Sequence, residues 1–194
     1  MKKAAEDKLA EALSRFDAAN SADPNIEELD GISYPKELLY AQRMTRWLDA
    51  LEPDAPEAVQ LAVRAQHICR WQIPRNQYPM DRQGYLAWRT ELGKFHARTA
   101  GDILQDVGYD QEMVAKVQKL LRKEELKQDP EVQLLEDVAC LVFLESYFAD
   151  FSAKHEQEKV IQIVQRTWRK MSERAHRQAL KLPLPEFVTA ALSP

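Results

Sequence analysis

The sequence has 194 residues, of which 45% are hydrophobic and 30% are charged. Lysine and arginine number 27 and aspartate and glutamate 31, so the formal net charge is −4. These values exclude intrinsic disorder and a strongly basic nucleic-acid-binding domain, and the length fits one compact domain over residues 1–194. The chain holds 5 glycines, a low proportion that disfavours a turn-rich β fold and favours an all-α fold.

Apolar residues at helical spacing, separated by proline-marked breaks, predict about seven helices. Pro35, Pro56 and the Asp129-Pro130 pair open helices, Asp110 caps one, and Gly108 ends one. A polar stretch after the first helix is expected to be a loop or a short turn, and the tail from residue 182 is expected to form a short helix or to remain loose. The predicted helices cover about residues 4–19, 35–52, 57–71, 84–107, 110–123, 131–151 and 156–180.

The segment from Gln72 to Gln83 stands out among the connections. It contains two prolines and two arginines and has no helical period. Loops of this length usually carry function or are disordered, so we expect this loop to contribute to a binding site.

No targeting or membrane segment is expected. The first ten residues lack an apolar leader, and the longest apolar run, Val138 to Leu144, is far shorter than the roughly 18 residues of a membrane span. A cytoplasmic protein is the expectation. Cys69 and Cys140 each lie in an apolar stretch, which predicts two reduced core cysteines.

Two neighbouring carboxylates, Glu136 and Asp137, lie on the most apolar helix of the chain. A buried ionised carboxylate is costly unless it is paired or binds a metal, and adjacent helical residues point about 100° apart. At least one of the two is therefore expected to face the interior. The alternative, that Asp137 pairs with an arginine while Glu136 faces solvent, carries equal weight.

Two histidines lie at the apolar borders of their helices. His67 stands between Val63 and Trp71 at four-residue spacing, and His96 follows Phe95. Taken alone, each histidine is better explained as a residue of the core than as a metal ligand. Together with Asp137 they form a set of nitrogen and oxygen ligands suited to a divalent metal such as iron, manganese or zinc.

The segment LAVRAQHICRW, residues 61–71, resembles a helix of HD-domain phosphohydrolases, and residues 96–141 resemble the second half of that fold. The resemblance implies an HD-domain-like core at about residues 37–151, followed by a C-terminal helix and tail at 156–194. Asp137 matches the final metal-binding aspartate of those enzymes. Gln66-His67 stands where their His-Asp doublet belongs, and a second register takes His67 as the first metal ligand and His96-Ala97 as the doublet. Both registers retain His67, His96 and Asp137.

The whole chain also resembles the domain of unknown function 4202 family. The blocks that carry this likeness include YPKELLYAQRMTRWL, RAQHICRWQIPR and QLLEDVACLVFLE. The resemblance implies membership of that family and no activity. Glu145, Asn20 and Asp23 are candidates for the ligand that the HD-type pattern lacks.

These observations predict a divergent HD-like, metal-dependent phosphohydrolase that acts on a nucleotide or another small phosphate ester. A metal bound by His67, His96 and Asp137 would lower the pKa of its water, and Glu136 would act as the catalytic base or orient a histidine. The alternative is a non-catalytic helical binding protein with a degenerate site. The oligomeric state stays open. The residues expected to bind the anionic ligand are Arg70, Arg75, Arg82, Arg89, Lys123 and Trp71.

Overall fold

A computed structural model describes residues 2–192 and confirms the all-α class. Within these residues ten α-helices and one β-hairpin occur, so the expectation of about seven helices is too low. Short 3-10 helices η1 and η2 and a π-helical segment η3 complete the order. The elements are α1 (Lys2–Asn20), β1 (Ile26–Leu29), β2 (Ile32–Pro35), α2 (Lys36–Leu51), α3 (Glu57–Arg64), η1 (Arg70–Gln72), η2 (Arg75–Gln77), α4 (Arg82–Val107), α5 (Gln111–Arg122), α6 (Pro130–Val142), η3 (Phe143–Tyr147), α7 (Phe148–Ala153), α8 (Gln157–Trp168), α9 (Glu173–Ala179) and α10 (Glu186–Leu192).

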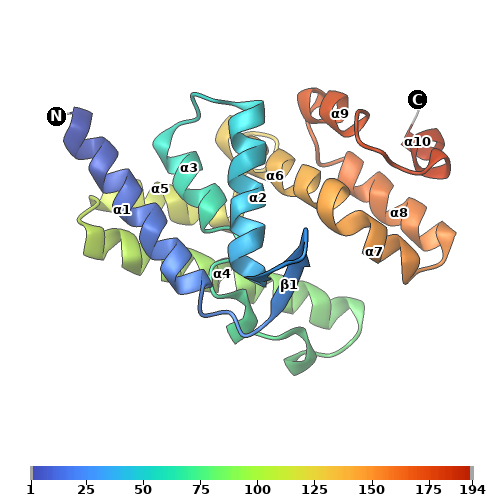
Figure 1. The fold of residues 1–194 in the computed structure, drawn as a ribbon, viewed down its shortest axis with the longest axis horizontal. Helices are drawn as coiled ribbons and strands as arrows, with labels where there is room; N and C mark the ends of the chain where they lie inside the picture. The colour runs from blue at the N-terminus through green and yellow to red at the C-terminus, as the bar shows by residue number, and fades with distance from the viewer. Residues whose placement is uncertain (1, 193–194) are drawn as a thin grey trace.

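The helix α2 runs vertically through the middle of the molecule in Figure 1, with other helices on both sides of it. It contacts α3 on one side and α6 on the other, and α4 lies along α5. The helices α8, α9 and α10 lie together at the end opposite α1 (Figure 1). One hydrophobic cluster runs through the interior, from Ala12 of α1 to Leu192 of α10, and includes both cysteines. Burial of this cluster is the main stabilising contribution to the fold.

Local sequence signals set several helix ends where they were expected. Asp110 caps α5 by accepting a hydrogen bond from the Met113 N–H, and Asp129 caps α6 with Pro130 in its first turn. Gly108 ends α4 with a positive φ of 92°, a conformation that glycine adopts at little cost.

The predicted helix at 57–71 is too long, because α3 ends at Arg64. Cys69 adopts a left-handed conformation with φ 52°, and its N–H binds the side-chain oxygen of Asn20 at 3.0 Å. The carbonyl of Ile68 accepts from the His96 ring at 2.8 Å. The Cys69 N–H and the Ile68 carbonyl are thus bound to side chains of α1 and α4. In a continued helix, these groups would form hydrogen bonds within the helix backbone.

The predicted helix at 156–180 is divided into α8 and α9 at Ser172. Ser172 caps α9, since its hydroxyl accepts from the Ala175 N–H. Its own N–H and hydroxyl are both donated to the carboxylate of Asp137 on α6. The break is thus held by a buried carboxylate on another helix, which the local sequence does not reveal.

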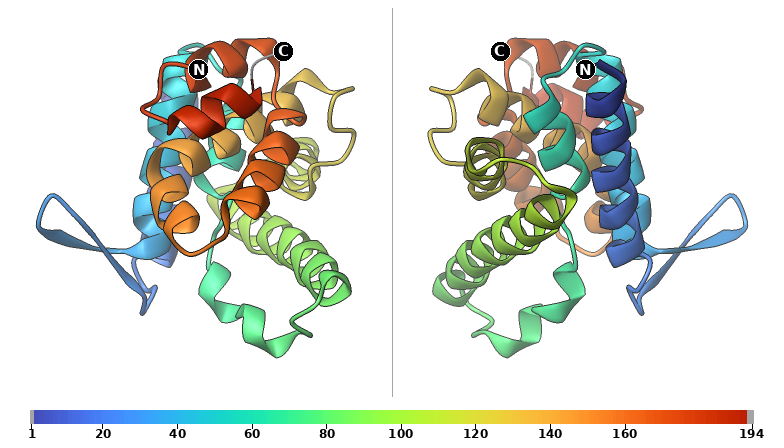
Figure 2. Two further views of the ribbon diagram at one scale, coloured as in Figure 1. Left: turned by 90° about the vertical axis from the view of Figure 1, so that its right-hand side faces the viewer. Right: turned by 90° about the vertical axis from the view of Figure 1, so that its left-hand side faces the viewer.

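The polar stretch after α1 contains a β-hairpin that the sequence did not predict. β1 and β2 pair antiparallel, with Ile26 opposite Pro35, and turn at Asp30 and Gly31, whose φ values are 52° and 77°. The hairpin projects from the helical body in both views of Figure 2. Each strand has four residues, which is too short to show a clear alternation of apolar and polar residues.

The loop at 72–83 is ordered by two side chains. Trp88 donates its indole N–H to the carbonyl of Ile73 at 2.8 Å, and Arg75 binds the carbonyls of Tyr78 and Pro79 at 3.0 and 2.6 Å. Asp81 then caps α4 by accepting from the Gly84 N–H. The hydrogen bonds of the Arg75 side chain therefore hold the loop backbone in its conformation.

Gly84→Ala is expected to destabilise the protein by about 1–3 kcal/mol, since overpacking a close contact costs about that much. An added Cβ would lie 2.1 Å from the carbonyl oxygen of Pro79. Gly93→Ala on the same helix is the matched control, because its nearest neighbour would be 3.8 Å away, and removal of a mid-helix glycine is expected to stabilise by up to about 1 kcal/mol. Urea unfolding of both variants measures the difference. Equal stabilities would contradict the close approach of Pro79.

Among residues 2–192, the structure contains no helix with the length and apolar character required to cross a bilayer.

Candidate functional site

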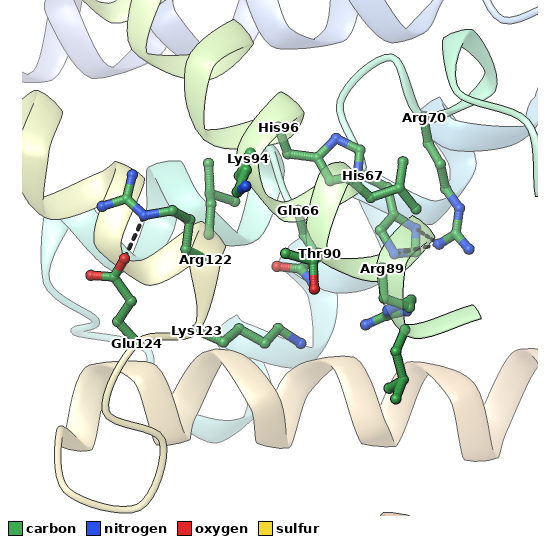
Figure 3. Close-up of a pocket in the computed structure, with 14 residues that line it drawn as sticks. Gln66, His67, Arg70, Arg89, Thr90, Lys94, His96, Arg122, Lys123 and Glu124 are labelled. Atoms are coloured by element: carbon green, nitrogen blue, oxygen red, sulfur yellow. Dashed lines mark hydrogen bonds and ion pairs between the residues drawn. The ribbon is translucent and has the colours of Figure 1, made fainter. Parts of the chain in front are cut away.

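Two adjoining cavities, of about 430 and 590 Å³, lie beside α4 and share His67, Arg70 and Arg89 among their lining residues. We refer to them together as the basic cavity. Figure 3 shows the smaller one: His67, Arg70 and Arg89 lie together, and Lys123 extends toward them from the end of α5. Its glutamates, within residues 2–192, are Glu37, Glu124 and Glu136. Its cationic side chains, counted over the same residues, are Lys36, Arg70, Arg89, Lys94, Arg122, Lys123 and Lys170.

Two of the three glutamates are bound by cations of the cavity itself. Glu124 accepts from Arg122 at 2.6 Å. Glu136 is paired with Lys123, and its other oxygen lies 3.4 Å from the Lys170 ammonium. Burial would raise the pKa of Glu136, but Lys123 and Lys170 outweigh it and lower the pKa to about 2. Glu136 therefore stays ionised and holds two lysines at the cavity wall.

Lys36, Arg89 and Lys94 have no ion pair with any described residue. Arg89 and Lys94 are exposed on α4, and Lys36 is exposed at the start of α2. The cavity consequently holds an excess of positive charge, although the whole chain carries a net charge of −4.

His67 links Arg70 to Glu37. The Arg70 Nη1 lies 2.7 Å from Nε2 and 3.2 Å from Nδ1 of His67, and Nδ1 lies 3.2 Å from a carboxyl oxygen of Glu37. Because a guanidinium only donates, Nε2 accepts, and the ring proton is assigned to Nδ1. Tyr40 stacks on the imidazole with ring centroids 3.9 Å apart. Burial lowers the pKa of His67 well below its usual value, and Arg70 adds to this effect.

Glu37 is a buried carboxyl group of the cavity with a strongly raised pKa. Burial raises its pKa to about 7, against the opposing charge of Arg70. Its backbone N–H binds Asp23 at 3.0 Å, which fixes the first turn of α2. A carboxyl group of this kind is about half protonated near neutral pH.

His96 and Gln66, which line the smaller cavity, each contain a buried acceptor without a partner among residues 2–192. His96 Nδ1 donates to the Ile68 carbonyl, which leaves Nε2 as a bare acceptor. Nε2 of His96 and Oε1 of Gln66 are buried and have no hydrogen-bond partner among residues 2–192. Burial lowers the pKa of His96 to about 3, so this ring stays neutral.

The predicted metal ligands are only partly brought together. The rings of His67 and His96 lie 5.9 Å apart. Asp137 does not line either cavity, and its oxygens accept from Ser172 and from Gln133 at 2.9 Å. Arg70 occupies the Nε2 side of His67. Within residues 2–192, no group of three histidine, cysteine or acidic side chains is arranged to hold a metal ion. The three predicted ligands thus do not fit one metal as they are arranged here.

The residues considered as replacement ligands are engaged elsewhere. Glu145 accepts from the Trp47 indole at 2.8 Å and pairs with Arg46. Asn20 binds the Cys69 N–H, and Asp23 binds the backbone of Asn25 and of Glu37.

Of the predicted anion-binding residues, Arg70, Arg89 and Lys123 line the basic cavity. Arg75, Arg82 and Trp71 do not line it. Arg75 binds loop carbonyls, Arg82 is exposed at the start of α4, and Trp71 packs against the core.

Sequence reasoning missed four residues that line the larger cavity: Lys36, Glu37, Tyr40 and Lys170. Glu37 follows Pro35 in the first turn of α2, where an acidic residue commonly faces solvent near the positive end of the helix. No signal in the sequence shows that this turn is covered by the segment after α3.

Comparison with known families identifies one match. A family model described as domain of unknown function (DUF4202) matches residues 10–192. No curated protein and no solved structure matches the chain.

Proposed function

The chain belongs to the DUF4202 family, and we propose that it binds a small phosphate-bearing molecule in the basic cavity. One observation carries this proposal: Arg70, Arg89, Lys123 and Lys170 come from four separate segments and face the same cavity. Glu136 offsets part of the charge of Lys123 and Lys170, but holding the remaining positive charges together without a further anion still costs free energy. A bound anion would remove that cost.

Phosphate suits this arrangement better than a single carboxylate does. Two arginines offer planar pairs of donors, which match phosphate oxygens, and the lysines add point charges. The cavity volumes of about 430 and 590 Å³ are in the range of small-molecule sites. Tyr40, Tyr85 and Tyr147 line the larger cavity and supply aromatic surface for the rest of the ligand.

Isothermal titration calorimetry with inorganic phosphate, a nucleoside monophosphate and acetate tests the proposal. We expect both phosphates to bind and acetate to bind far more weakly. Arg89→Gln should weaken phosphate binding by about 10- to 100-fold, since a charge-assisted hydrogen bond contributes about 1.5–3 kcal/mol. Arg166→Gln, an exposed position of α8 outside the cavity, should leave it unchanged. Absence of phosphate binding, or equal effects of the two variants, would reject the proposal.

Anion binding is expected to weaken as the pH rises through the pKa of Glu37, which is about 7. Below that pH the carboxyl is neutral, and above it a negative charge opposes the ligand. Sulfate is the suitable probe because its own charge is constant in this range. Between pH 6 and pH 8 its affinity should fall on the order of tenfold, as expected for one like charge a few ångströms away.

Glu37→Gln is the matched variant for this measurement. It keeps the shape of the side chain and removes its titration, so its sulfate affinity should be nearly constant from pH 6 to pH 8. His67 and His96 do not contribute to the change, because burial keeps both pKa values below this window. A wild-type profile that is flat, or a variant profile that is as steep as the wild type, would contradict the role of Glu37.

A second candidate function is hydrolysis of the bound phosphate ester. The favouring observation is Glu37, whose pKa of about 7 suits a group that gives or accepts a proton at neutral pH. The sequence likeness to HD-domain phosphohydrolases points in the same direction. Glu136 is the weaker candidate for a base, because a carboxylate with a pKa of about 2 has little affinity for a proton at neutral pH.

Release of phosphate from p-nitrophenyl phosphate tests hydrolysis, with and without added iron(II), manganese(II) and zinc(II). Turnover that Glu37→Gln reduces by a factor of roughly 10²–10⁴, the usual contribution of general acid–base catalysis, would support this candidate. Binding of phosphate without turnover under any of these conditions would leave the chain as a binding protein.

A further inference from the structure

We propose that the ligand of the basic cavity carries a hydroxyl group within a few bonds of its phosphate, and that Gln66 and His96 accept hydrogen bonds from it. This inference rests on the proposed binding of a phosphate and names the class of compound: a phosphorylated polyol or sugar. It is carried by two buried acceptors that the protein leaves unpaired beside the cations.

His96 supplies the first acceptor. It lies in the middle of α4 with 4% of its surface exposed. The bond from Nδ1 to the Ile68 carbonyl, 2.8 Å long, fixes the ring so that Nε2 has a lone pair and no proton. Nε2 has no partner among the described residues, and His96 lines the smaller cavity.

Gln66 supplies the second acceptor from the turn after α3. The residue is 6% exposed, its Oε1 has no partner among residues 2–192, and it lines both cavities. In Figure 3 its side chain lies among His67, Thr90 and Lys123. Burying an acceptor without a partner is costly, so a ligand in the cavity that brings a donor to these two atoms would be favoured.

The residues that hold the acceptors line the same cavity as the cations. The His96 ring lies 5.9 Å from the His67 ring, and His67 is bound to Arg70 at 2.7 Å. Gln66, Arg70 and Lys123 line both cavities. An ester whose phosphate binds Arg70 and Lys123 would therefore extend through a cavity that His96 and Gln66 also line.

A hydroxyl group fits these atoms better than the other common neighbours of a phosphate. An alkyl chain carries no donor and would leave the two acceptors unpaired. A second anionic group would be repelled by their lone pairs. A hydroxyl donates to one acceptor, and a second hydroxyl on the adjoining carbon donates to the other.

Calorimetry with glycerol 3-phosphate and propyl phosphate tests the inference, with inorganic phosphate as the reference. The two esters share charge and carbon number and differ in their hydroxyl groups. We expect glycerol 3-phosphate to bind at least about tenfold more tightly, given the cost of leaving buried acceptors unpaired. Gln66→Met and His96→Phe should each reduce this ratio. The variants alter different segments, so a folding defect in one, revealed by its thermal unfolding, leaves the other informative.

The outcomes separate this inference from the proposed function. Equal binding of the two esters by the wild type, with inorganic phosphate still bound, would overturn the hydroxyl specificity and keep the phosphate site. A ratio that neither variant changes would show that the hydroxyl groups are recognised elsewhere and would also overturn the assignment. Failure of inorganic phosphate and of both esters to bind would reject the proposed function, and this inference with it.

Discussion

Arg70→Gln is expected to weaken the binding of inorganic phosphate by about 10- to 100-fold, because it removes a charge-assisted donor that contributes about 1.5–3 kcal/mol. Arg70 lies at the centre of the basic cavity and lines both of its parts. Its guanidinium is held in place by the bond to His67 and by Trp88, whose ring centre is 4.9 Å away. Burial lowers the pKa of Arg70, yet an arginine stays charged at neutral pH.

Arg70→Lys separates charge from geometry in the same titration. Lysine keeps the positive charge and loses the planar pair of donors, so the expected loss of affinity is smaller than that of the glutamine variant. Circular dichroism of both variants checks that the fold is retained. A phosphate affinity that is the same in wild type, Arg70→Gln and Arg70→Lys would place the anion site elsewhere.

Asp137→Ala is expected to lower the free energy of unfolding by about 3 kcal/mol, since it leaves buried donors without their charged acceptor. Asp137 is 4% exposed and accepts from the Ser172 N–H, the Ser172 hydroxyl and the Gln133 amide. In a protein of this size such a loss corresponds to a fall in Tm of about 6–12 °C. Differential scanning calorimetry measures it.

Asp106→Ala is the matched control, because Asp106 is exposed on α4 and surface substitutions usually change stability by less than about 0.5 kcal/mol. A metal-ligand role for Asp137 makes the opposite prediction. In that case Asp137→Ala would lose metal affinity while the metal-free protein kept its Tm. An unchanged Tm would therefore contradict the structural role assigned here.

The parts of the fold that were predicted correctly are those whose signals are local. Asp110, Asp129 and Gly108 act on backbone groups within a few residues of themselves. The ends of α3 and α8 depend on Asn20, His96 and Asp137, which come from distant segments. A tertiary contact of this kind overrides the helical period and leaves no trace in the neighbouring sequence.

The candidate site, like the fold, was predicted only in part from the sequence. Periodicity placed His67 and His96 at the borders of apolar faces, and the structure brings them together. At least one of Glu136 and Asp137 was expected to face the interior. Both are buried, so Glu136 does not face solvent, and among residues 2–192 Asp137 binds Ser172 and not an arginine. Which buried faces meet depends on helix packing, and this also explains why Glu37 and Lys170 escaped notice. The sequence pattern identified polar residues on apolar helix faces, but it did not show which residues their side chains bind.

We propose that the basic cavity binds a phosphate-like anion. The most direct test is a crystal structure of the protein grown with selenate, whose position is revealed by anomalous scattering. We expect a selenium peak inside the cavity, within hydrogen-bond distance of Arg70 or Arg89 and of Lys123. Selenium peaks confined to the outer surface, with none in the cavity at a saturating concentration of selenate, would contradict it.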